Sequence, residues 1–191
     1  MQQINYQYHK KWWVVIIIAA YVLFGCGRAQ ERTEAPVTFF DLKGYFQQEI
    51  KRLETSNYSF AKTVRINDST EHQQSQTLHF EQELTPFIQC DINRRDWLDK
   101  YQVDSVIENG YLTALRYTAQ DERLRTRVLD IQFQQNLVHS VQIKTGGQST
   151  VAGSTQQLQY QPQQGYSIQS IQQTLLGKDK NLEINVLFIE K

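Results

Sequence analysis

The sequence has few cysteines, few prolines and no excess of charge of either sign. Of its 191 residues, only Cys26 and Cys90 are cysteines, three are prolines, and 20 basic residues balance 20 acidic ones. Two cysteines are too few for a disulfide scaffold, and the fold must therefore depend on a hydrophobic core. A neutral chain also lacks the basic field that nucleic acid or an anionic lipid surface attracts.

The sequence also lacks a hydrophobic run long enough for an ordinary membrane-spanning helix. Its longest apolar run is Trp12–Phe24, which is 13 residues long, whereas a span needs about 20. Lys10 and Lys11 precede this run, and Gly25-Cys26 follows it. A basic region, an apolar region and a small residue in this order are typical of a secretory signal peptide.

The segment Leu23-Phe24-Gly25-Cys26 resembles the lipobox of bacterial lipoproteins. The resemblance implies that the Cys26 thiol receives a diacylglycerol and that the signal peptide, residues 1–25, is cut off before it. Residues 26–37 would then be the lipidated cysteine and a polar tether, and residues 38–191 a single domain. Two alternatives stay open, namely ordinary cleavage after Ala29 and an uncleaved, tilted anchor.

Cleavage before Cys26 would leave 18 basic and 20 acidic residues, because residues 1–25 contain Lys10, Lys11 and no acidic residue. The remaining chain has the length of one ordinary domain with a sizeable core. The tether, fully extended, would reach at most about 35–40 Å and keep this domain close to the membrane.

Apolar residues at helical spacing predict an amphipathic helix over residues 39–53 that packs on a sheet. Thr38 and Asp41 are spaced as in a capping box, Gly44 weakens the helix slightly, and Ser56-Asn57 ends it. The apolar stripe consists of Phe39, Leu42, Phe46, Ile50 and Leu53.

Two strands are predicted next, over residues 58–66 and 74–79, with a turn at residues 67–69. A short central helical region then contains Pro86, which should kink or end it. Asn93 followed by Asp96 predicts the cap of a further short helix that carries Trp97, Leu98 and Tyr101.

From Val103 onward the apolar period changes to two, and turn residues recur at short intervals, as at Asn109-Gly110. This pattern predicts an antiparallel meander. The expected fold is therefore α+β, with the N-terminal helix and the short central helical region packed on an antiparallel β-meander sheet. Residues 145–154 predict a loop of small residues.

Catalytic and metal-binding interpretations of the sequence are weaker than structural ones. Cys90 has apolar neighbours and is expected to be a packed core cysteine rather than a nucleophile. His72 and His79 lack the tight spacing of a zinc site, and His139 alternates with apolar strand residues. We therefore expect no catalytic, metal or cofactor-binding residues, and Cys26 as the one site residue, a lipid anchor.

Three polar groups allow a ligand but have simpler explanations. Gly146-Gly147 lacks the lysine of a phosphate loop. Asp91, Asp96 and Asp99 are expected in turns and caps rather than as a pair of catalytic acids. A basic stripe lies close to acidic residues, which predicts a solvent-exposed face with ion pairs; the stripe consists of Arg116, Arg123, Arg125 and Arg127.

The chain also resembles a broad group of small cell-envelope lipoproteins of Bacteroidota to which no activity is assigned. The resemblance lies in the lipobox, the helix Phe39–Leu53, the segment Glu83–Asn93 and the segment Leu158–Ile168. It implies a lipid-anchored protein in the cell envelope, most simply at the outer membrane of a Gram-negative bacterium.

These observations favour a non-enzymatic scaffold or accessory subunit that contacts other envelope proteins. The alternative is a binder or carrier of an apolar ligand, in a half-barrel-like cavity that resembles those of the lipoprotein carrier and its outer-membrane receptor. That alternative depends on a set of aromatic residues expected on the inner face of the sheet, namely Phe60, Tyr111, Tyr117, Phe133, Tyr160 and Phe188. The two hypotheses differ in whether a cavity of about 300–1,000 Å³ lies between sheet and helices.

Overall fold

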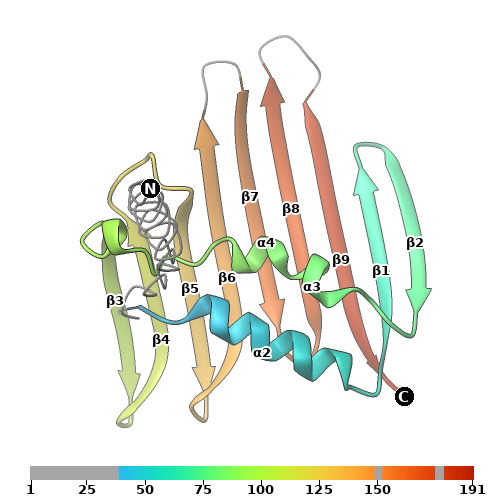
Figure 1. Cartoon of the computed structure of the whole chain (residues 1–191), viewed down its shortest axis with the longest axis horizontal. Helices are drawn as coiled ribbons and strands as arrows, with labels where there is room; N and C mark the ends of the chain where they lie inside the picture. Colours follow the sequence, from blue (N-terminus) through green and yellow to red (C-terminus); the bar gives the residue numbers. More distant parts are fainter. Residues whose placement is uncertain (1–38, 149–151, 175–178) are drawn as a thin grey trace, which may run out of the picture. The chain divides into compact units, whose positions relative to one another are not determined.

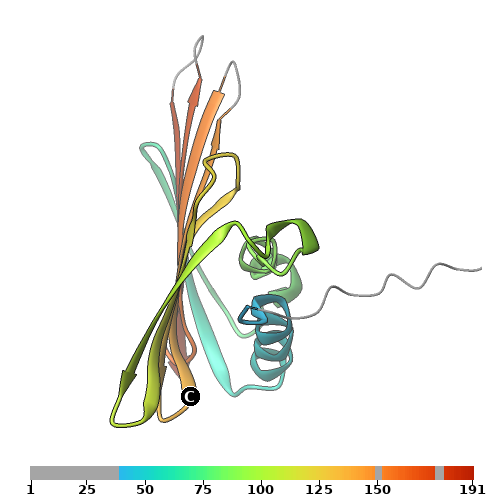
Figure 2. The same cartoon turned by 90° about the vertical axis from the view of Figure 1, so that its left-hand side faces the viewer.

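The computed structural model describes residues 39–148, 152–174 and 179–191. In this part of the chain, one antiparallel sheet of nine strands carries three short α-helices on one of its faces, so the fold is α+β (Figures 1 and 2). We call this face the covered face. The opposite face carries no helix among the described residues, and we call it the uncovered face.

Seven of the nine strands, β3 to β9, form the predicted meander, in which each strand pairs with the next one along the chain. Asn109-Gly110 and Gln135-Asn136 form tight turns with positive φ angles, as such hairpin turns require. The seven strands are β3 (Tyr101–Glu108), β4 (Tyr111–Ala119), β5 (Thr126–Gln134), β6 (Leu137–Gln148), β7 (Ala152–Gln161), β8 (Gly165–Thr174) and β9 (Lys180–Glu190).

A hairpin from the beginning of the domain completes the sheet. Strand β1 (Tyr58–Ile66) pairs with β9, and β2 (Ser69–Ser75) lies outside β1. The strand order is therefore β2-β1-β9-β8-β7-β6-β5-β4-β3. Strands β2 and β3 form the two opposite edges of the sheet, although they follow one another in the chain, with residues 76–100 between them.

The helices cross the covered face over the middle of the sheet (Figure 1). They are α2 (Leu42–Glu54), α3 (Phe80–Glu83) and α4 (Thr85–Ile88). The predicted stripe of α2 is buried, and the Phe46 ring lies 5.1 Å from that of Tyr160 on β7. Each such fully buried apolar side chain contributes about 1.5–3 kcal/mol, so the stripe holds α2 on the sheet.

Several predicted element boundaries are wrong. Asp41, rather than Thr38, caps α2, and its Oδ1 accepts a 2.8 Å hydrogen bond from the amide of Gly44. A side chain at position 44 would collide with that carboxylate, so Gly44 serves the cap. Thr38 lies outside the described residues, and Phe39 is buried but precedes the helix.

The second strand of the first hairpin occupies residues 69–75 instead of 74–79. This strand lies at the edge of the sheet and is exposed on both faces, so its sequence lacks the alternation of apolar residues by which a strand is predicted. The predicted 145–154 loop is largely strand, because β6 continues to Gln148 and β7 begins at Ala152. The residues between them lie outside the described ranges.

Near the centre of the chain, Pro86 lies in the first turn of α4, directly after the break between two short helices, as predicted. The expected helix after Asn93 is a single 3-10 turn, Arg95–Trp97, which no side chain caps. Tyr101 belongs to β3 rather than to this turn. Asn93 has a different role, described below.

Candidate functional site: the uncovered face of the sheet

The uncovered face carries a continuous row of polar side chains. Starting from Thr63 on β1, each residue of the row pairs directly with its neighbour on the next strand. We call this set the polar row; from β2 to β3 it consists of His72, Thr63, Asn185, Ser167, Gln159, Gln142, Asp130, Arg116 and Asp104. The row crosses all nine strands without an apolar residue.

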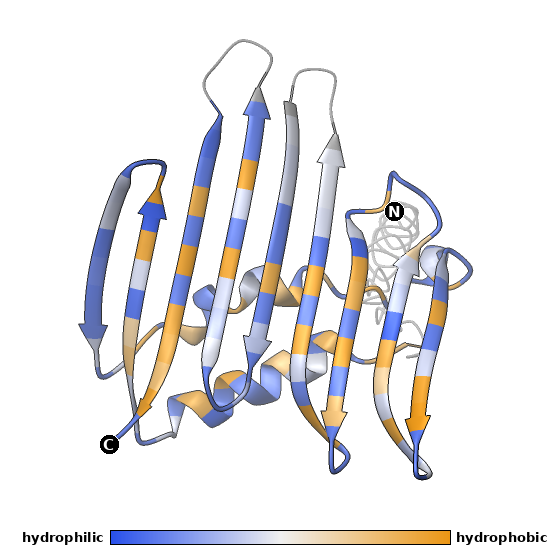
Figure 3. Cartoon of the chain, turned by 180° about the vertical axis from the view of Figure 1, so that it is seen from behind, coloured by the Kyte–Doolittle hydropathy of each residue, from blue (hydrophilic) through white to orange (hydrophobic). Residues whose placement is uncertain are grey.

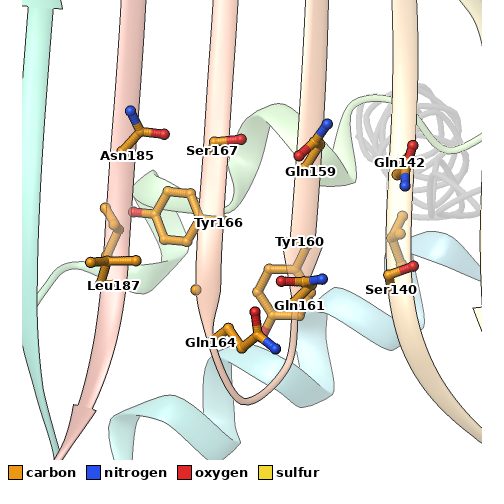
Figure 4. Close-up of a pocket in the computed structure, with 13 residues that line it drawn as sticks. Ser140, Gln142, Gln159, Tyr160, Gln161, Gln164, Tyr166, Ser167, Asn185 and Leu187 are labelled. Carbon is orange, nitrogen blue, oxygen red and sulfur yellow. The ribbon is translucent and has the colours of Figure 1, made fainter.

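Alternation along the strands places this row opposite the core. Tyr160 and Tyr166 are buried on the covered face, so their neighbours Gln159 and Ser167 point the other way. Figure 3 shows the uncovered face with the helices behind it. In Figure 4, Asn185, Ser167, Gln159 and Gln142 stand side by side on four strands.

A shallow groove of about 180 Å³ lies in the middle of the uncovered face, lined by residues of β6, β7, β8 and β9. The groove has a local cause, because Ser140, Gly165 and Ser167, which line it, have little or no side chain to fill it. Gly165 has φ 137°, and a Cβ atom on it would lie 1.9 Å from the carbonyl oxygen of Val186. Glycine is thus required for the close approach of β8 and β9.

Two ion pairs lie on this face, one at either side of the neutral centre of the polar row. Arg116 donates from Nε to Asp130 Oδ2 at 2.8 Å, and Arg65 on β1 pairs with Glu183 on β9. Between these pairs the row carries only amides and hydroxyls. Such a surface offers both donors and acceptors and has no net charge.

Two tyrosines behind the groove bind the helices to the sheet. Tyr160 and Tyr166 face each other across β7 and β8. Tyr160 donates its hydroxyl proton to Glu49 of α2 at 2.5 Å, and Tyr166 donates to Glu83 of α3 at 2.6 Å. Burial, followed by the neighbouring glutamate, raises the pKa of each tyrosine well above its usual range. We call these two contacts the tyrosine pins.

Each glutamate of the tyrosine pins also contacts a cation. Arg52 donates to Glu49 at 2.7 Å and to the carbonyl of Pro162 at 2.6 Å, and Lys62 pairs with Glu83. Buried carboxylates are costly unless paired and hydrogen-bonded, and both conditions hold here. The pins therefore fix the β7–β8 hairpin, whose other side forms the groove.

Tyr45 of α2 lies next to Glu49, and its hydroxyl is buried without a hydrogen-bond partner among the described residues. Burial raises the pKa of this hydroxyl well above its usual range. A buried polar atom without a partner costs stability.

Cys90 is a core residue, as the sequence predicts. Its side chain is fully buried, and its Sγ lies 3.2 Å from the carbonyl oxygen of Pro86. Burial raises the pKa of the thiol to about 11. A buried thiol of that pKa is a poor nucleophile at neutral pH. Cys26, the predicted lipid anchor, lies outside the described residues.

The histidines are not brought together. His72 lies on β2, where its Nδ1 is 3.0 Å from Thr63 Oγ1. His79 precedes α3, and His139 is exposed on β6. Within the ranges that the structure describes, no group of three histidine, cysteine or acidic side chains could hold a metal ion.

Asp91 and Asn93 fasten the beginning of α2 to the domain. The Asn93 side chain accepts from the amide of Phe39 at 3.0 Å and donates to the carbonyl of Phe40 at 2.9 Å. Asp91 accepts from the amide of Lys43 at 3.1 Å. Asp91, one of the three aspartates considered as catalytic acids, therefore has a structural role at the beginning of α2.

The predicted arginine stripe is divided between strands and a loop, with Arg116 on β4, Arg127 on β5 and the other two in the loop between them. Arg123 and Arg125 lie between β4 and β5, and together with Gly146 and Gly147 they line a cleft of about 620 Å³. Arg123 pairs with Asp121 at 2.7 Å, and Glu122 lies on the same wall. One expected ion pair thus forms at this cleft, and another joins Arg116 to Asp130 on the sheet.

Most of the aromatic residues considered for an apolar-ligand cavity belong to the packed core. Phe60, Tyr117, Tyr160 and Phe188 are buried, and their rings pack against other rings of the core, for example Phe60 edge-on against Phe80 of α3 at 5.0 Å. Tyr111 is an exception to the expectation, because it is 60% exposed at the β3–β4 turn.

Comparison with known proteins gives no match: no family model, no curated protein and no solved structure matches the chain. In the described ranges, no helix has the length and hydropathy needed to cross a membrane.

Sequence reasoning predicted no structural role for Glu49 or for Glu83, although Glu83 belongs to the segment that carries the resemblance to envelope lipoproteins. For Glu49 a signal existed, because residue 49 falls inside the stripe formed by Leu42, Phe46 and Leu53. A charged residue at a core position indicates a buried partner. Nothing near Glu83 gives a comparable signal.

Proposed function

We propose that this protein is a non-enzymatic, lipid-anchored scaffold or accessory subunit of the bacterial outer membrane, and that it contacts envelope partners through the uncovered face. The observation that carries the proposal is the polar row, which crosses the full width of the sheet. Cys26 would hold the acyl chains, and two or three chains give stable attachment.

The dimensions of the uncovered face suit a protein partner better than a small ligand. Nine strands of 7 to 12 residues, about nine on average and about 4.8 Å apart, give a face of about 38 by 30 Å. That area, about 1,100 Å², exceeds the roughly 800 Å² that each partner buries in a stable complex. The groove beside Gln159 and Ser167, of about 180 Å³, is by itself smaller than the usual ligand pocket of about 300–1,000 Å³, so this part of the face suits a protein surface better.

The packed core supports this proposal over an apolar-ligand carrier. Phe46, Phe87 and Tyr160 are fully buried where the carrier would need its cavity, with ring centroids 4.9–6.0 Å apart. Opening that space would break the tyrosine pins as well. The burial of Cys90 and the dispersed histidines support a non-enzymatic role.

The anchor is tested with Cys26→Ser. We expect the variant to lose palmitate labelling and to leave the membrane fraction, because the thiol is the acceptor of the lipid. Wild-type labelling and membrane association in the variant would remove the lipoprotein proposal.

The contact face is tested by photo-crosslinking in the native envelope, with a photoreactive residue at Gln159 or at Ser167. Gln48, an exposed glutamine of α2, is the matched control on the covered side. We expect the same protein adduct from both polar-row positions and none from position 48. An adduct of equal yield at position 48, or none at either row position, would contradict the proposed face.

A further inference from the structure

The two edges of the sheet differ sharply in composition. The β2 edge reads Ser-Thr-Glu-His-Gln-Gln-Ser and has no apolar side chain. On the β3 edge, Val103 is 49% exposed, Val106 48% and Ile107 66%. An exposed edge strand with β-branched side chains is a template for pairing with another strand.

Strand β3 is regular enough to act as such a template. The register of β3 and β4 shifts between Val106 and Ile107, where the partners move from Ala114 to Leu112. The extra residue, Thr113, thus lies on β4, and β3 continues without interruption. Among the described residues, no strand pairs with its outer side.

The described chain begins beside this edge. Its first residue, Phe39, packs its ring 6.0 Å from that of Tyr101, the first residue of β3, and 5.3 Å from that of Tyr117. Strand β2 lies at the opposite edge of the sheet. An anchor at Cys26 would hold the copies in one membrane, within reach of one another.

We propose that β3 pairs with β3 of a second copy of this chain, antiparallel and centred on Ser105. A two-fold axis perpendicular to the sheet keeps the uncovered faces on the same side and pairs residues of like orientation. The opposed pairs are then Ser105 with Ser105, Asp104 with Val106, Val103 with Ile107, and Gln102 with Glu108.

The register follows from charge and length. Centring on position 104 would oppose Asp104 to itself, and centring on position 106 would oppose Asp104 to Glu108; like charges directly opposed are destabilising. Centring on Val103 pairs fewer residues of β3. The register centred on Ser105 pairs residues 102–108 and places two Val103–Ile107 contacts on the covered face.

This contact is small, so its strength depends on local concentration. Seven paired residues make a strip about 24 Å long and one strand wide, less than a stable soluble dimer buries. Anchoring in one membrane raises the effective concentration of the copies; this part of the inference rests on the proposed function. The dimer would also place two polar rows side by side on one continuous face.

The experiment uses the full chain in its own membranes, with Ser105→Cys and mild oxidation. Opposed cysteines in an antiparallel pair are within disulfide reach. The matched control is Gln73→Cys, near the centre of the β2 edge, and the wild type reports any reaction of the native cysteines. We expect several-fold more disulfide-linked dimer from position 105 than from position 73.

A second variant tests the role of the apolar side chains. Adding Ile107→Lys to Ser105→Cys should reduce the dimer several-fold at an unchanged melting temperature, because Ile107 is exposed in the single copy. No dimer from Ser105→Cys, or an equal yield from Gln73→Cys, would overturn the inference. So would an unchanged yield with Ile107→Lys.

Membrane fractionation of the same samples separates this inference from the proposed function. Failure of the anchor would appear as soluble protein, whatever the dimer yield. Failure of edge pairing would appear as monomer in the membrane fraction. Dimer in the soluble fraction would uphold the pairing and contradict the anchor.

Discussion

Tyr160→Phe tests whether the tyrosine pins hold the helices on the sheet. The substitution removes only the hydroxyl that donates to Glu49 at 2.5 Å and leaves the ring in the core. A hydrogen bond to a charged group contributes about 1.5–3 kcal/mol. We therefore expect the free energy of unfolding to fall by about 2 kcal/mol and the melting temperature by about 4–8 °C.

Tyr58→Phe is the matched control, because Tyr58 is half-buried beside Phe188 and lies outside the pins. We expect it to change the free energy of unfolding by less than about 0.5 kcal/mol. A double-mutant cycle of Tyr160→Phe with Glu49→Gln should show a coupling of about 0.5–3 kcal/mol. The reasoning fails if Tyr160→Phe is no more destabilising than the control, or if the cycle shows no coupling.

Three further predictions concern the core. Phe46→Asp should abolish cooperative thermal unfolding, because it puts a carboxylate at a fully buried position; a variant that keeps its melting temperature would make this helix face an interface. Cys90→Ala should lower the free energy of unfolding by about 1 kcal/mol, and the wild-type thiol, with its pKa raised to about 11, should react with a thiol reagent only as the chain unfolds. Fast labelling of the folded protein would contradict that. Burial raises the pKa of Tyr101 to about 12 and those of Tyr160 and Tyr166 further, so the unfolded chain loses these protons first and stability should fall as the pH rises above about 10. Denaturation across that range should show a shallower pH dependence for Tyr160→Phe than for wild type, and equal slopes would refute the assignment.

The parts of the fold that the sequence predicts well are those with one apolar side. The bounds of β1, residues 58–66, agree with the prediction, and the stripe of α2 is buried. The apolar residues of α2 recur at a helical period, whereas in β1 only Phe60 is buried. Strand β2 has solvent on both faces and the edge of the sheet beside it, so its polar sequence carries no such period.

The candidate surface was visible from the sequence only as scattered glutamines and alternating polar residues. Gln142 and Gln159 become neighbours because β6 and β7 pair in one particular register. The clamp by Asn93 on Phe39 and Phe40 joins segments more than 50 residues apart. Register and long-range hydrogen bonds depend on the assembled sheet, so local sequence patterns do not determine them.

The division of polar residues between the two faces of the sheet follows from what each face must do. On the covered face, charged residues are few, and Glu49 and Glu83 are each bound to a cation and a tyrosine. This arrangement fixes the helices on the sheet. On the uncovered face, the centre of the polar row carries amides and hydroxyls, so a partner bound there would meet donors and acceptors whose positions follow from the strand register. An apolar face of this size would promote aggregation, and a charged one would attract any counter-charged surface. Neutral amides and hydroxyls instead bind well only a partner whose own donors and acceptors match their spacing.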